Sequence, residues 1–145
     1  MTFIQAVRFC LRKGYLDYKG RASKSEYWYY MLFSAVLFTA SGYVMFQKLW
    51  LGAILLIYFF IPFVTLISRR FHDIGKSSKW YMIIGFFGIL TTYIFTIPGV
   101  SHWYFFIPTI FYLVWFIILI VIGSKKGVVG PNKYGDDPKM INKII

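Results

Sequence analysis

The sequence has few charged residues, and three long stretches contain none. Only 14% of the 145 residues are charged, whereas an average soluble domain has about 25%. No Asp, Glu, Lys or Arg occurs in 27–47, 49–68 or 80–124. Uninterrupted apolar runs of about 18 residues or more are typical of membrane spans. The chain is therefore predicted to be an integral membrane protein rather than a soluble globule.

Cysteine, histidine and acidic residues are also scarce. A single cysteine excludes a disulfide scaffold, and two histidines with five acidic residues offer little material for a metal site. The aromatic residues lie in charge-free runs rather than among the basic ones, which argues against nucleic-acid binding. The first apolar run begins only at Tyr27 and is too long for a cleavable signal peptide. We therefore expect no metal, no cofactor and no nucleic-acid partner.

The apolar runs predict an all-α membrane protein, a bundle of four transmembrane helices in a single domain covering 1–145. The helices are expected at 27–46, 49–68, 80–97 and 103–123, each long enough to cross a hydrocarbon core of roughly 30 Å. Pro98 and Gly99 divide the longest run into two helices.

The basic residues predict the orientation in the membrane. Every Lys and Arg except Lys48 precedes the first span, lies between the second and third, or follows the fourth. By the positive-inside rule, both termini and the middle loop face the cytoplasm.

The segment 1–26 is predicted to be cytoplasmic and to contain a short amphipathic helix. Its apolar residues recur at helical spacing from Phe3 to Leu11, with Thr2 as a cap and Gly14 as a stop. We expect this helix to lie in the membrane interface. Ser23 and Glu26 have the spacing of a capping box at the start of the first span. The tail 124–145 is rich in turn residues and is expected to remain cytoplasmic.

Two catalytic patterns appear between the second and third spans, and both are incomplete. Gly75-Lys76-Ser77 ends like a P-loop, but Arg70 occupies the position that needs glycine. His72-Asp73 is like a phosphohydrolase metal doublet, but the only other histidine, His102, lies across the membrane in the predicted topology. Neither pattern predicts a phosphate-binding loop or a metal centre.

Three motifs make the sequence recognisable. Residues 20–28 read GRASKSEYW, residues 69–77 read RRFHDIGKS, and residues 130–138 read GPNKYGDDP. In this order and spacing they resemble the YhaH/YhaI-like bacterial inner-membrane proteins, domain-of-unknown-function family 805. The resemblance covers about 15–138. It implies a small multi-helix protein of the bacterial plasma membrane and supplies no activity.

All three motifs fall on the cytoplasmic side of the predicted topology, so their polar residues are expected to meet in one cluster. Its members are Arg21, Glu26, Arg69, Arg70, His72, Asp73, Asn132, Tyr134, Asp136 and Asp137. One interpretation is a structural latch, in which carboxylates pair with arginines and the tail folds back onto the helix ends. Another is an anionic site, in which the arginines bind a phospholipid headgroup. A docking face for another protein is the third.

The predicted spans contain no ionisable residue, although ion-coupled transporters usually place such residues there. A stripe of small residues, Gly85, Gly88, Thr92 and Thr96, marks the third span. Such stripes are typical of close helix packing, either within the chain or between copies.

The leading hypothesis is therefore a structural or accessory protein of the bacterial plasma membrane. Its basic cytoplasmic face would contact anionic phospholipid, a partner membrane protein or a second copy of the chain. A small-solute transporter or channel subunit is the alternative. A lipid-headgroup enzyme is the third hypothesis, with His72, Asp73 and Asp136 as its only acid–base groups. No catalytic residue is assigned.

Overall fold

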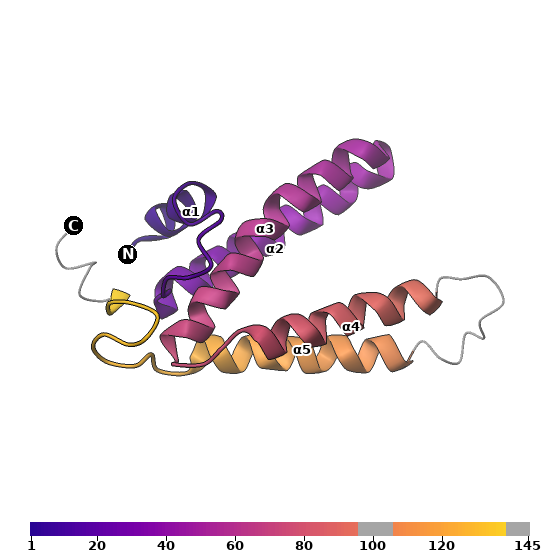
Figure 1. Cartoon of the computed structure of the whole chain (residues 1–145). Coiled ribbons are helices and arrows are strands. Elements are labelled where there is room, and N and C mark those ends of the chain that lie inside the picture. The colour runs from indigo at the N-terminus through magenta and orange to yellow at the C-terminus, as the bar shows by residue number, and fades with distance from the viewer. Residues whose placement is uncertain (96–105, 139–145) are drawn as a thin grey trace.

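The computed structural model describes residues 1–95 and 106–138, and this part of the chain is helical, without a named strand. Five helices follow one another: α1 (Phe3–Leu11), α2 (Lys24–Gln47), α3 (Leu49–Asp73), α4 (Lys79–Phe95) and α5 (Phe106–Ser124). They form two helical hairpins, α2 with α3 and α4 with α5, which diverge from a common end like the arms of a V (Figure 1). The short helix α1 packs against α2 near that end.

The hairpin of α2 and α3 is tight because a glycine lets the two backbones approach. Lys48 alone separates the helices. A Cβ atom on Gly52 would lie 2.3 Å from the Cα of Met45, closer than any side chain permits. Glycine is therefore required here by the close approach of the helices.

Aromatic side chains join the two hairpins. Tyr27 is fully buried and donates its hydroxyl to the carbonyl of Leu119 at 3.0 Å. Trp115 of α5 stacks on Tyr81 with ring centroids 5.3 Å apart and contacts Phe63 at 6.1 Å. The core therefore lies where the arms of the V meet, close to the ends of α2, α3 and α5.

Three helices, α2, α3 and α5, are long and apolar enough to cross a membrane. The apolar part of α4 is shorter, Tyr81–Leu90 within a helix of 17 residues. The multi-pass helical architecture predicted from the sequence agrees with this structure. The predicted third and fourth spans correspond to α4 and α5, and the connection predicted between them, with Pro98 and Gly99, lies outside the described residues.

One boundary prediction was wrong. The second span was expected to end at Ser68, followed by a loop, but α3 continues to Asp73. Arg69, Arg70, His72 and Asp73 therefore occupy its last helical turns. The change to charged residues ends an apolar run, but it does not end the backbone hydrogen-bonding pattern, and arginine is a good helix former.

The amphipathic helix predicted near the N-terminus is present as α1. Thr2 caps it, and the side chain of Gln5 bonds back to the backbone N–H of Thr2 at 2.8 Å. Ala6 and Cys10 are buried. Its location in the membrane interface stays a prediction.

The Ser23 cap of α2 is confirmed, since its hydroxyl accepts a hydrogen bond from the N–H of Glu26 at 3.3 Å. The expected return contact from Glu26 is absent from the described hydrogen bonds, because that carboxylate pairs with Arg69 instead.

The small-residue stripe of α4 faces its own hairpin partner. A Cβ on Gly85 would lie 3.4 Å from Nε1 of Trp115, and one on Gly88 would lie 3.9 Å from the Cβ of Phe111. These two glycines therefore let α4 pack on α5 within the chain. The side chains of Thr92 and Thr96 lie outside the described residues.

Candidate functional site

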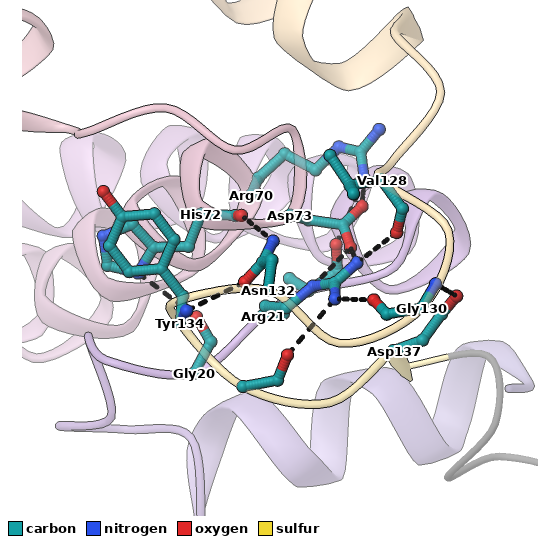
Figure 2. Close-up of polar contacts among 12 residues, drawn as sticks. Gly20, Arg21, Arg70, His72, Asp73, Val128, Gly130, Asn132, Tyr134 and Asp137 are labelled. Carbon is teal, nitrogen blue, oxygen red and sulfur yellow. Dashed lines mark hydrogen bonds and ion pairs between the residues drawn. The ribbon is translucent and has the colours of Figure 1, made fainter.

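Three segments that are distant in the sequence meet at the closed end of the V. They are the loop and first turn at 19–26, the last turns of α3 at 69–73, and residues 122–137, which include the end of α5 and the chain that follows it. We call this assembly the cap. Figure 2 shows its centre, where the chain after α5 curves around Arg21, Asp73 and His72.

The first part of the cap is a buried ion pair between α2 and α3. Nη1 of Arg69 lies 2.5 Å from Oε1 of Glu26, and both side chains are at most 6% exposed. The thiol of Cys10 lies 3.7 Å from each partner and so brings α1 into the cluster. The Arg69 guanidinium also lies over the ring of Phe9, 5.1 Å from its centroid. One ion pair therefore ties three helices together.

The second part is centred on Asp73. Arg21 donates to Oδ1 of Asp73 through Nε at 3.2 Å and Nη2 at 3.0 Å. Arg70 contacts the other carboxylate oxygen from the same helix face, three residues away. Two guanidinium groups thus share one buried carboxylate. Burial of the negative charge of Asp73 is offset by these paired and hydrogen-bonded cations.

Arg21 also binds the chain that follows α5. Its Nη1 donates to the carbonyl of Gly130 at 2.6 Å, and its Nη2 donates to that of Val128 at 2.5 Å (Figure 2). The N–H of Val128 returns a bond to the carbonyl of Asp73 at 2.8 Å. The chain after α5 is therefore attached to α3 and to the loop before α2.

The C-terminus of α5 is capped by cations from other helices. The last carbonyls of a helix have no partner within it, and cations stabilise this negative end of the helix dipole. Arg70 donates to the carbonyls of Ile122, at 3.0 Å, and Lys125. Lys24 at the start of α2 donates to that of Ser124. The end of one hairpin is thus completed by side chains of the other.

His72 fixes the loop and the tail together. Its Nδ1 lies 3.2 Å from the carbonyl oxygen of Lys19, and its ring stacks on Tyr134 with centroids 3.8 Å apart. Asn132 donates its amide to the carbonyl of His72 at 3.0 Å and accepts the N–H of Tyr134 at 2.8 Å. His72 therefore has partners on both sides of the cap.

The structure brings together every predicted cluster residue except Asp136. That side chain is exposed and makes no hydrogen bond or ion pair within the described part of the chain. Its neighbour Asp137 is buried instead and accepts the N–H of Gly130 at 3.2 Å.

Gly127 in the cap and Cys10 beside it in α1 were not predicted as members of the cluster from the sequence. Burial, and then the nearby Glu26 carboxylate, raise the pKa of the Cys10 thiol to about 12. A Cβ on Gly127 would lie 2.1 Å from Oδ2 of Asp73, so only glycine fits there. The only sequence signal for Cys10 is its position on the apolar face of α1. Nothing in the sequence indicates the role of Gly127.

The polar side chains of the cap are paired with one another, as in a cluster that stabilises the fold. Among the described residues, no three His, Cys, Asp or Glu side chains gather as a metal site would require. Of the acid–base groups considered for catalysis, Asp73 is held by two arginines, His72 is stacked on Tyr134, and Asp136 stands apart. The cap is thus an internally neutralised cluster of ion pairs.

Comparison with known proteins gives the family. Residues 15–136 match the model of a family described as protein of unknown function (DUF805). The chain belongs to the DUF805 family. The matched region begins after α1 and contains nearly the whole cap, so the DUF805 region includes the ion-paired residues but not the helix that Cys10 brings to them.

Two of the relatives that the chain resembles are inner membrane proteins of a bacterium. The chain is 28% identical over 131 residues to the inner membrane protein YhaI of Escherichia coli, covering 88% of this chain and 90% of that protein. It is 27% identical over 136 residues to the inner membrane protein YhaH, covering 88% and 92%. It is 30% identical over 128 residues to the uncharacterized protein YiiR, covering 83% and 85%. No solved structure matches. These relatives and the long apolar helices support a multi-pass protein of the bacterial inner membrane.

Proposed function

We propose that this DUF805 protein is a structural or accessory membrane protein whose basic cytoplasmic end contacts anionic phospholipid. In this proposal α2, α3, α4 and α5 all cross the membrane and both termini are cytoplasmic. The cap acts as the structural latch considered from the sequence. The phospholipid contact is made by exposed cations around the cap rather than by the arginines within it.

The observation that carries this proposal is the contrast between three buried arginines and the exposed cations around them. The guanidinium groups of Arg21, Arg69 and Arg70 are buried and bonded within the chain. Around them, the following cations are exposed: Arg8, Arg12, Lys13, Lys19, Lys76, Lys79, Lys125, Lys126 and Lys133. Juxtamembrane cations of this kind attract anionic lipid, by about 1 kcal/mol per residue near the surface.

Most of the acidic residues are buried, so they do little to offset the exposed cations. Three of the five, Glu26, Asp73 and Asp137, are buried. Asp17 accepts the N–H groups of Lys19 and Gly20 in its own loop. Few negative charges remain to offset the exposed cations, so this end of the molecule presents a positive surface to its surroundings.

The orientation follows from where the cations lie on the fold. Lys48 lies at the turn between α2 and α3, which is the end of that hairpin away from the cap (Figure 1). The other described cations lie at or near the cap. The positive-inside rule then favours a cytoplasmic cap.

Anionic lipid would stabilise the folded protein if this contact exists, because a ligand that binds only the folded state raises its stability. We would compare unfolding temperatures in nanodiscs of phosphatidylglycerol and of phosphatidylcholine. We expect a higher value in phosphatidylglycerol, and a smaller difference in a variant with Lys13, Lys19, Lys76 and Lys133 all changed to Gln. Lys48→Gln is the control and should keep the full difference. Equal unfolding temperatures for the wild type in both lipids would contradict the lipid contact.

Orientation can be tested separately. In a Cys10→Ala background, Lys48→Cys and Lys133→Cys would each be treated with a membrane-impermeant maleimide after the outer membrane is opened. We expect labelling at position 48 and none at position 133. The reverse pattern would place the cap on the periplasmic side.

A further inference from the structure

A small polar cavity lies against the cap, at the level where two apolar helices end. Its volume is about 230 Å³, and it is lined by both charged and backbone groups. The charged residues of its wall are Lys24, Arg70, Asp73, Lys126 and Asp137, and residues 127–129 complete much of the rest. At about 30 Å³ for each water molecule, this is room for a hydrated phosphate group.

A separate cavity of about 320 Å³ is apolar, and its lining includes Phe60, Tyr81 and Trp115. The two cavities differ in chemistry as well as in size. Of these two, only the polar cavity has cationic side chains in its lining, so it is the one suited to an anion.

The charges around the polar cavity favour an anion. Asp73 is already neutralised by Arg21 and Arg70. The remaining carboxylate, Asp137, accepts the N–H of Gly130 and is outnumbered by the ammonium groups of Lys24 and Lys126. Lys24 uses one of its three N–H donors on the carbonyl of Ser124. Lys126 is exposed and bonds to no described side chain or carbonyl. Two ammonium groups therefore keep donors available for a ligand.

The position of the cavity indicates where such an anion comes from. Lys24 is the first residue of α2, and Lys126 follows the last residue of α5 by two positions. Both helices are long and apolar enough to cross a membrane, so their ends lie at the depth of the lipid headgroups. A phosphate carried by a lipid reaches this depth without leaving the bilayer.

We propose that this cavity binds the phosphate of one anionic phospholipid between Lys24 and Lys126. The inference rests on the proposed function and makes it more specific, because a defined pocket replaces a general attraction. Bound there, the phosphate would bridge the start of α2 and the end of α5, which belong to different hairpins.

The test is native mass spectrometry of the delipidated protein titrated with phosphatidylglycerol in a non-ionic detergent. The variant Lys24→Gln/Lys126→Gln is compared with the matched control Lys19→Gln/Lys125→Gln, which removes the same charge from exposed side chains outside the cavity. We expect one tightly bound lipid in the wild type and in the control. The cavity variant should bind it at least about tenfold more weakly, the effect of losing one charge-assisted hydrogen bond.

The outcomes separate this inference from the proposed function. Equal weakening in both variants would overturn the pocket but keep the general lipid contact. No preference for phosphatidylglycerol in any variant would overturn both. Displacement of the lipid by inorganic phosphate at similar concentration would assign the cavity to free phosphate and overturn the lipid source. If the double variant unfolds, the single changes Lys126→Gln and Lys125→Gln make the same comparison at exposed positions.

Discussion

Removing one partner of the Arg69–Glu26 pair should destabilise the protein strongly. Both side chains are almost fully buried, with Nη1 of Arg69 2.5 Å from Oε1 of Glu26. Changing Arg69 to Met leaves the carboxylate without its cation. Breaking a buried ion pair in this way costs about 3–5 kcal/mol, because an uncompensated charge stays buried.

The expected cost can be measured as a change in unfolding temperature. For a chain of about 150 residues, each kcal/mol corresponds to roughly 2–4 °C, so Arg69→Met should lower the value by about 10 °C. Glu26→Gln should have a similar effect, because it leaves the guanidinium unpaired. Arg12→Met is the control, since Arg12 is exposed on the same side of the molecule, and it should change the value little.

The double variant Arg69→Met/Glu26→Gln provides the decisive comparison. Because each single change already abolishes the pair, the two effects should not add, and the double variant should lose less than their sum by at least about 1 kcal/mol. Fluorescence-detected size-exclusion chromatography after heating would measure the wild type, the two single variants, the double variant and the Arg12→Met control in one detergent. Additive losses, or single losses no larger than that of Arg12→Met, would refute the reasoning.

Three further predictions concern other parts of the cap. Gly127→Ala should cost about 1–3 kcal/mol through overpacking, measured by thermal unfolding, whereas Gly42→Ala, with open space around it, should be neutral. Cys10, with a pKa of about 12, should resist iodoacetamide at pH 8 until the protein unfolds. Because the unfolded thiol titrates near 9.0, the stability due to its protonated form should decline as pH rises from 9.0 towards 12. Tyr134→Ala should expose the tail to limited proteolysis, while Tyr134→Phe should keep the stack on His72 and the wild-type pattern.

Hydropathy was sufficient to predict the helices but not where α3 ends. The apolar run stops at Ser68, which by hydropathy predicts a loop from Arg69 onward. The helix continues for five more residues because its charged side chains find partners in the cap. Apolar periodicity reports which face is buried in apolar surroundings, so it carries no information about a helical turn that is buried by ion pairs.

The membership of the cap was largely predictable, and its pairing was not. The motifs fall on one side of the predicted topology, which is enough to bring them near one another. Whether Asp136 or Asp137 is buried depends on the course of the chain after α5, where Gly130 and Gly135 have positive φ angles. A difference of one position in that turn reverses which carboxylate faces inward, and no residue spacing in the sequence determines it.

Adjacent arginines have different roles because of helix geometry. Successive residues on a helix are separated by about 100°, so Arg69 and Arg70 leave α3 in different directions. Arg69 meets Glu26 and Cys10 between the first three helices, whereas Arg70 meets Asp73 and the end of α5. If α3 ended at Ser68, no helical geometry would fix this difference in direction. The extra turns of α3 therefore allow one pair of neighbouring residues to hold both hairpins, and loss of Arg70 should loosen α5 while the contact between α1, α2 and α3 persists.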